Sequence, residues 1–279
     1  HGTAVAGILA SNGEKNEDEY SFKNIYDSSS ELLDKITGIN PYVNIYAATV
    51  INEQNKAKVA DVIKGIQWAW DSGCKIINIS CGFAKDNESL HRIIKAAYQD
   101  GILFVAPAGN GGDVQYPAKY EEVIAVGSLK CDGELAKDSS VGIGVEVVAP
   151  GDSVTSYGYF DVLQVFSGTS MAAPQVSALA ALLWQQDLSK SNIFIRNLID
   201  RSANKIGSEE KYGYGLIDCE AALENYSKTM DVAEEDIIES TTENDKPLFC
   251  IEDDELQGFW TKDVHQEMAK DGLYKAMEM

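Results

Sequence analysis

Apolar residues along the chain fall into two alternating patterns, short continuous runs and longer stretches with helical spacing. Continuous runs are typical of strands buried on both faces, whereas apolar positions three and four apart indicate helices. Strands are predicted at residues 43–50, 75–80, 102–106 and 123–126. Helices are predicted at residues 57–72, 90–100, 170–186, 193–202 and 219–226. The alternation predicts an α/β fold with a mostly parallel central sheet flanked by helices on both faces.

The C-terminal part of the chain differs in composition from the rest. Residues 227–279 carry fifteen acidic and five basic residues. Within them, residues 231–245 have the composition of a flexible acidic linker. Residues 256–277 place apolar side chains such as Trp260 at roughly helical spacing, which fits either an amphipathic helix that docks on the body or a partner, or a weakly ordered tail. We therefore divide the chain into a folded unit at residues 1–226 and an acidic appendage.

A second acidic stretch occupies residues 13–34. Its carboxylates lack the spacing of a metal-ligand set, which favours a solvated surface insertion over a metal site. No other segment shows the pattern of a cofactor or metal site. We expect none.

The overall charge limits the classes of partner. The chain has 279 residues, 44% of them hydrophobic, and a net charge of −21. This charge disfavours nucleic acid and anionic membranes as partners, and favours basic peptides through long-range attraction. The sequence contains no run of about eighteen apolar residues, so it predicts no membrane-spanning helix.

The cysteines bear on the compartment. Five are present, an odd number without metal-type spacing: Cys74, Cys81, Cys131, Cys219 and Cys250. We interpret them as free thiols, which favours a reducing compartment such as the cytoplasm but does not identify it.

The peptide of residues 167–174, Ser-Gly-Thr-Ser-Met-Ala-Ala-Pro, has the strongest chemical signal in the chain. Ser170 falls in the first turn of a predicted helix, where unpaired N–H groups and the helix dipole favour developing negative charge. Gly168 allows a second backbone or a substrate to approach closely. This arrangement suits acyl transfer, although an isolated Gly-Thr-Ser is more often a helix cap.

Two further segments support a catalytic interpretation. His1 precedes a short predicted helix in which Val5, Ile8 and Leu9 share a face. Asn110 follows the buried strand at residues 102–106, at the end of a parallel sheet where active sites are found. Taken singly, His1 could be structural and Asn110 could be a turn residue.

Together the three segments resemble the subtilisin (subtilase) family of serine endopeptidases. Residues 1–7 match the family's His-Gly-Thr-x-Val-Ala-Gly box, residues 168–174 match Gly-Thr-Ser-Met-Ala-x-Pro, and residues 108–110 match Ala-Gly-Asn. Weaker similarities extend the resemblance over roughly residues 1–226. The resemblance implies the three-layer subtilisin-like fold and hydrolysis of polypeptides. Ser170 would be the nucleophile, His1 the general base, and Asn110 with the Ser170 N–H would stabilise the oxyanion.

The family's catalytic Asp precedes the His along the chain, and here the His is residue 1. No downstream acid has the family's Asp-box context; those considered are Asp113, Asp152, Asp161 and Asp218. We therefore expect this sequence to be a piece of a longer protein that lacks the Asp-bearing strand. We also expect it to fold poorly and to be inactive alone, because that strand lies inside the family's sheet.

The resemblance also places a substrate site. An extended substrate would pair with residues 80–82 on one side and with the loop at residues 54–57 on the other. The residues implied for the pocket of the substrate side chain before the scissile bond (P1) are Ser80, Cys81, Gly82, Pro107, Ala108, Gly109 and Gln115. Many family members have glycine in place of Gln115, so we expect a shorter or more polar pocket that accepts large aromatic residues poorly. The Cys81 thiol would lie in its wall, either open to thiol reagents or simply buried.

Two other functions compete with this one. A non-catalytic subtilase-like scaffold that binds peptides would also explain the absent Asp. A lipase-type α/β-hydrolase requires Gly-x-Ser-x-Gly followed by a His. Ala172 stands where its second glycine belongs, and His265 in the tail is the only downstream His, so this reading is set aside. His91 and His265 are expected at the surface.

Overall fold

The structure is a computed structural model that describes residues 1–12, 36–52, 54, 56–158 and 162–229. The acidic stretch predicted at residues 13–34 and the linker and helix predicted in the tail lie outside the described residues, as do Asp161, Cys250 and His265. None of the helices in the described part of the chain is long and apolar enough to cross a bilayer.

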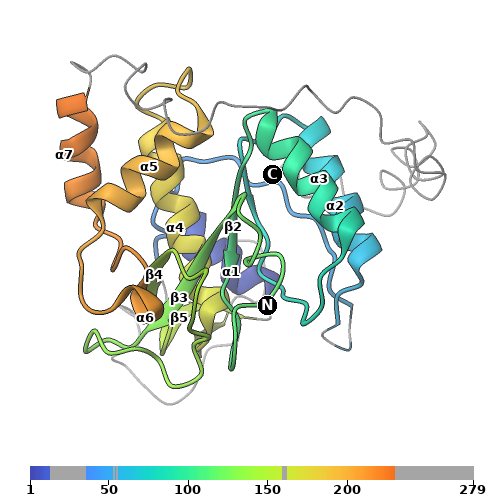
Figure 1. The fold of residues 1–279 in the computed structure, drawn as a ribbon, viewed down its shortest axis with the longest axis horizontal. Helices are drawn as coiled ribbons and strands as arrows, with labels where there is room; N and C mark the ends of the chain where they lie inside the picture. The colour runs from blue at the N-terminus through green and yellow to red at the C-terminus, as the bar shows by residue number, and fades with distance from the viewer. Residues whose placement is uncertain (13–35, 53, 55, 159–161, 230–279) are drawn as a thin grey trace.

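A parallel sheet of four strands in the order β1-β2-β3-β4 forms the centre of the molecule (Figure 1). Its strands are β1 (Ile76–Asn78), β2 (Leu103–Pro107), β3 (Val123–Leu129) and β4 (Val147–Pro150). Every residue of β2 and β3 is buried. This explains their continuous apolar runs, because a parallel strand with helices on both faces has no polar side. The predicted α/β sheet is confirmed.

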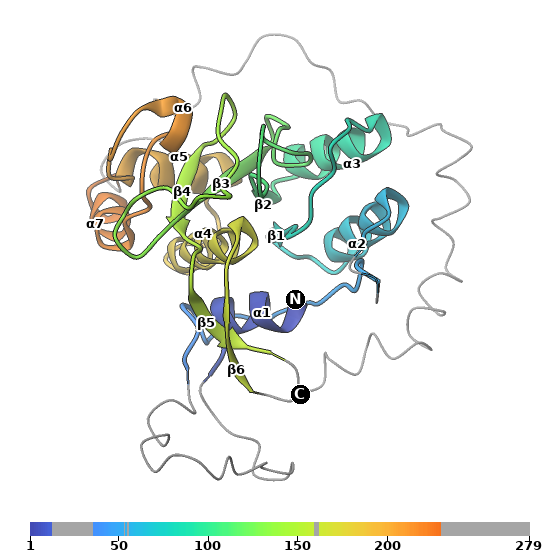
Figure 2. The ribbon, with the colours of Figure 1, turned by 90° about the horizontal axis from the view of Figure 1, so that it is seen from below.

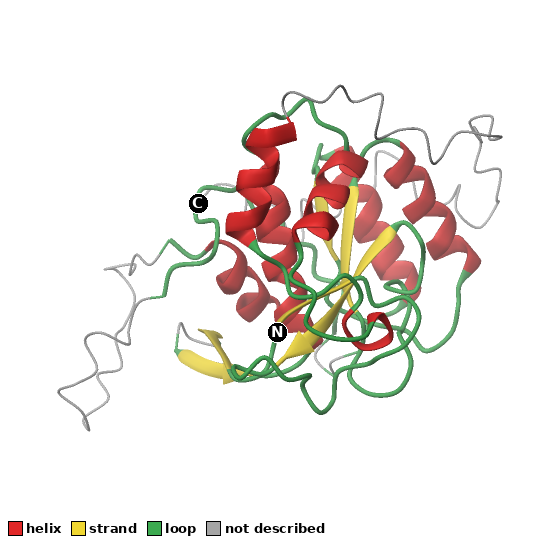
Figure 3. Ribbon diagram, turned by 60° about the vertical axis from the view of Figure 1, so that its left-hand side comes forward, coloured by secondary structure: helices red, strands yellow, loops and turns green. Residues whose placement is uncertain are grey.

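Helices cover both faces of this sheet (Figure 3). One face packs on α2 (Val59–Asp71) and α3 (Glu88–Gln99), around buried side chains such as Ile94 and Phe104. The other face packs on α4 (Thr169–Trp184), α5 (Asn192–Ser202) and α7 (Cys219–Thr229). The five helices predicted downstream of residue 50 are therefore confirmed, with ends that shift by up to three residues.

The remaining elements lie outside the main layers. They are α1 (Gly2–Ala10), the antiparallel hairpin of β5 (Val154–Tyr157) and β6 (Leu163–Phe166), and α6 (Glu209–Tyr212). Helix α1 lies beside α4 and the hairpin (Figure 2), and Ala4, Ile8 and Met171 form a small separate core between them. The Ser156 hydroxyl donates to the Ala4 carbonyl at 2.7 Å, which ties α1 to β5.

The prediction of a strand at residues 43–50 is wrong. The structure shows no strand there, and the one backbone hydrogen bond that this described segment makes runs from the Val43 N–H to the Asn40 carbonyl at 3.5 Å. Ile45 and Tyr46, which a strand in the sheet would bury, are exposed. A strand is defined by its ladder partner, and an apolar pattern cannot supply one.

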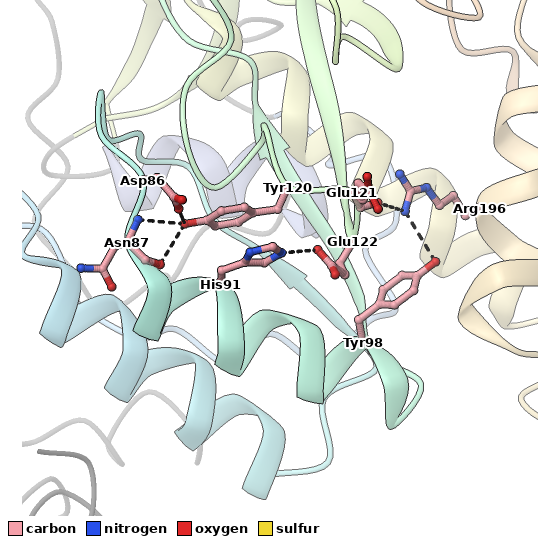
Figure 4. Close-up of polar contacts among 8 residues, drawn as sticks. All are labelled: Asp86, Asn87, His91, Tyr98, Tyr120, Glu121, Glu122 and Arg196. Atoms are coloured by element: carbon pink, nitrogen blue, oxygen red, sulfur yellow. Dashed lines mark hydrogen bonds and ion pairs between the residues drawn. The ribbon is translucent and has the colours of Figure 1, made fainter. Parts of the chain in front are cut away.

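Polar contacts join α3 and α5 to the loop before β3 (Figure 4). The Tyr120 hydroxyl donates to Asp86 Oδ1 at 2.8 Å, beside the start of α3. His91 stacks on the Tyr120 ring and contacts Glu122 at 3.0 Å, with about two-fifths of its side chain exposed. These contacts give His91 a structural role near the surface.

A charged cluster lies at the same end of the molecule, where α5 meets the segment before β4. The Arg196 guanidinium donates two hydrogen bonds to the Glu146 carboxylate, at 2.7 and 2.6 Å, and a third to the Glu121 carbonyl at 2.7 Å. Burial, followed by the neighbouring Glu146 carboxylate, raises the pKa of Asp200 to about 9. Asp200 therefore holds a proton in the folded protein at neutral pH.

This proton makes stability depend on pH. An unfolded Asp loses its proton near pH 4, so from about pH 4 to pH 9 the folded state binds one proton more, and stability falls as pH rises. Asp200→Asn keeps the shape without an ionisable group. We expect it to raise Tm by about 10 °C or more at pH 8 and much less at pH 4.5. Thermal unfolding at both pH values measures this, and an equal shift at both would contradict it.

Candidate active site

The start of α4 holds Ser170 in a turn whose backbone conformation favours glycine. Gly168 precedes the helix with φ of 137°, a conformation that other residues rarely adopt. A Cβ at Gly168 would also lie 3.1 Å from Asn110 Nδ2, closer than most real contacts. The next residue, Thr169, begins the helix, so Ser170 stands in its first turn with a half-buried side chain.

Asn110 is held against this turn by Thr169. Asn110 Oδ1 accepts hydrogen bonds from the Thr169 backbone N–H at 3.0 Å and from its hydroxyl at 2.9 Å. Thr169 Oγ1 in turn accepts from the Gly109 N–H at 3.3 Å. Because the carboxamide oxygen is occupied, the amide nitrogen is the group left to donate to a ligand. Asn110 and Ser170 are thus brought together, and the contribution of Thr169 was missed by the sequence analysis although it lies inside the Gly-Thr-Ser motif.

His1 stands at the start of α1, the helix that packs beside α4. Its side chain is exposed, and among the described residues nothing donates to or accepts from its ring. Ala4 and Ile8 pack on Met171, which follows Ser170 directly. His1 and Ser170 therefore lie at the N-terminal ends of two helices that are in contact. Their catalytic roles stay predictions.

Two of the acids considered from the sequence have other partners. Asp152 accepts from the Ser167 hydroxyl at 2.7 Å. Asp218 accepts from the Ala221 N–H at 2.9 Å at the start of α7, and this hydrogen bond lowers its pKa. Within the described ranges no carboxylate pairs with the His1 ring.

Four of the predicted P1 pocket residues, Gly82, Ala108, Gly109 and Gln115, are neighbours in space. The Gln115 N–H donates to the Ala108 carbonyl at 2.8 Å. A Cβ on Gly82 would collide with Gln115 Oε1, and one on Gly109 would lie 3.0 Å from Gln115 Cγ. The Gln115 side chain therefore fills the space between the segment at residues 80–82 and the one at residues 107–109.

Cys81 lies beside this space as a half-buried free thiol. Burial raises its pKa to about 11, so we expect the thiol to stay protonated at neutral pH and to react slowly with thiol reagents. Three other cysteines are free in the described structure: Cys74, Cys131 and Cys219. The described residues do not gather three or more side chains that could hold a metal ion.

Comparison with known proteins gives consistent similarities. A model of the subtilase family matches residues 1–215. Subtilisin DY from Bacillus licheniformis is 36% identical over 230 residues, which cover 80% of this chain and 77% of that protein. Subtilisin Savinase from Lederbergia lenta is 34% identical over 224 residues, with the same two shares.

Solved structures show the same likeness in space. The protease domain of PatA superposes with a TM-score of 0.71 at 25% identity, covering 84% of this chain and 82% of that one. Sphericase superposes with a TM-score of 0.64 at 28% identity, covering 77% and 76% of the two chains. Both superpositions extend over about three-quarters or more of this chain.

Proposed function

Because the chain belongs to the subtilase family, we propose that it acts as a serine endopeptidase in which Ser170 is the nucleophile, His1 the general base and Asn110 an oxyanion donor. The observation that carries this proposal is the pair of hydrogen bonds from Thr169 to Asn110 Oδ1, at 3.0 and 2.9 Å. These bonds leave the amide nitrogen as a fixed donor beside the first turn of α4. The substrates are polypeptides.

In the proposed mechanism Ser170 attacks the carbonyl carbon of the peptide bond while the His1 imidazole takes the hydroxyl proton. The oxygen of the tetrahedral intermediate is stabilised by the Asn110 amide and the Ser170 backbone N–H, which lies at the positive end of the α4 dipole. His1 then gives its proton to the leaving amine. Water hydrolyses the acyl-enzyme by the same sequence of proton transfers.

The mechanism also needs a carboxylate that orients His1. We propose that it comes from a strand outside the described residues that pairs with the outer edge of β1. In the described sheet β1 pairs with β2 alone, so its other edge is open. A parallel strand added there would end near the carboxyl end of β1, where Ser80 approaches Ser170. Without a carboxylate the expected rate is about 10⁴-fold lower.

A fluorophosphonate probe tests the proposal, because it bonds covalently to an activated serine and needs no peptide substrate. In the protein that includes the carboxylate-bearing strand, we expect one adduct, located by mass spectrometry on the peptide that contains Ser170. A folded protein that binds peptides but forms no adduct would favour the non-catalytic scaffold instead.

The position of Gln115 leads to a prediction on specificity. Gln115→Gly would empty the space between Gly82 and Gly109, so a large side chain could enter. We expect kcat/KM for substrates with Phe or Tyr at P1 to rise at least about tenfold relative to those with Ala. Gln186→Gly, an exposed position just beyond α4, is the control and should leave the ratio unchanged. An unchanged ratio in Gln115→Gly would exclude this residue as a determinant of P1 size.

A further inference from the structure

Helix α4 lacks one of its own hydrogen bonds at the nucleophile. Pro174 lies inside the helix and has no N–H, so the Ser170 carbonyl, four residues earlier, loses its helical donor. The Ser80 hydroxyl, from the segment that follows β1, faces this carbonyl with its oxygen 3.4 Å from the Ser170 carbonyl oxygen. The distance is long for a hydroxyl donor, which limits the energy of this bond but not its direction.

Ser80 is itself oriented by a chain of side-chain hydrogen bonds. Asn78 Nδ2, at the end of β1, donates to Ser80 Oγ at 2.8 Å. Ser177 Oγ lies 3.1 Å from Asn78 Oδ1 and 3.3 Å from the Ala173 carbonyl, so it can donate to either. Ser177 is fully buried, one helical turn beyond Pro174.

The direction of donation along these side-chain hydrogen bonds decides which group receives the Ser80 hydroxyl hydrogen. Asn78 presents its amide hydrogens to Ser80, so the Ser80 oxygen is an acceptor there and its own hydrogen is left for Ser170. When the Ser177 hydroxyl donates to Asn78 Oδ1, it holds the carboxamide in this orientation. Ser177 then donates to Asn78, Asn78 to Ser80 and Ser80 to the Ser170 carbonyl, so each hydrogen bond is directed from the core towards Ser170.

We propose that Ser80, oriented by Asn78 and Ser177, is a positioning residue for the nucleophile. Its hydroxyl replaces the hydrogen bond that Pro174 removes, and by holding the Ser170 carbonyl it restricts the backbone rotation that sets the direction of the Ser170 side chain. This inference rests on the proposed function, because a position for Ser170 matters only if Ser170 reacts.

The first test compares Ser80→Ala with the unchanged protein in fluorophosphonate labelling and peptide hydrolysis. We expect the labelling rate and kcat to fall about three- to tenfold, as for the loss of one neutral hydrogen bond, while KM stays within about twofold. Ser80→Thr keeps the hydroxyl and should restore most of the rate. Ser89→Ala, a half-buried serine on α3, is the control and should change neither.

A double-mutant cycle with Pro174→Ala separates positioning from general packing. The alanine brings back an N–H that can bond the Ser170 carbonyl within α4, so Ser80→Ala should cost less than about twofold in that background. An equal cost in both backgrounds would overturn the inference. Asn78→Asp, which has nearly the same shape but no amide donor, draws the Ser80 hydrogen away from Ser170 and should lower kcat as Ser80→Ala does.

The outcomes distinguish this inference from the proposed function. No adduct at Ser170 in the unchanged protein would overturn both. An adduct that forms at equal rates in the unchanged protein and in Ser80→Ala would overturn the positioning role alone. Thermal unfolding of each variant identifies any that does not fold, and Asn78→Asp then replaces Ser80→Ala in the comparison.

Discussion

Ser170→Ala is expected to eliminate the fluorophosphonate adduct and to lower peptide hydrolysis as much as any single substitution in this chain. The reason is chemical, because alanine has no oxygen to form the acyl-enzyme. Subtilisin itself loses about 10⁶-fold in kcat without its nucleophile, and about 3 × 10⁴-fold without its triad Asp alone. In a protein whose His1 lacks a carboxylate partner, Ser170→Ala should therefore lower kcat by about 10²-fold. In a protein that has this carboxylate, the same substitution should lower kcat by about 10⁶-fold.

The matched control is Ser167→Ala, three residues earlier in the same turn. The Ser167 hydroxyl is exposed and donates to Asp152 rather than towards the predicted site. We expect labelling and hydrolysis to stay within about threefold in this variant. Retention of the adduct in Ser170→Ala, or its loss in Ser167→Ala, would assign the nucleophile to a different residue.

The second large effect is expected at Asn110. Asn110→Leu removes the amide donor with little change in size, and we expect kcat to fall by about 10²–10³-fold, the loss known for the corresponding asparagine of subtilisin itself. KM should stay nearly constant, because the donor acts on the charge that develops in the transition state. Kinetics with a chromogenic peptide give both constants.

Asn110→Asp is the informative companion variant. Its carboxylate can still accept both hydrogen bonds from Thr169, so the local structure should persist. It offers an oxygen where the amide donor stood, and repulsion of the oxyanion should lower kcat at least as much as leucine does. A variant with normal kcat would show that Asn110 does not stabilise the oxyanion.

Local sequence was enough to predict the elements whose formation needs little help from distant residues. Strands β2 and β3 are continuous apolar runs, and such runs can be buried only between two layers. The turn at Gly168–Ser170 could be predicted because a small residue just before an apolar helical run is a typical helix start. Residues 43–50 have the same kind of apolar pattern, yet they form no strand because pairing depends on a neighbour that the pattern does not contain.

The sequence by itself determined the α/β class and the family, because these depend on short motifs and on periodicity, and the same motifs predict the residues of the site. Only the tertiary structure decided how the residues hold one another. Thr169 fixes Asn110 across 59 positions of the chain, Gln115 fills the space between two glycines, and Ser80 reaches Ser170 across 90 positions. Such contacts depend on how β1, β2 and α4 pack, and no local pattern records the distance between side chains that the fold brings together.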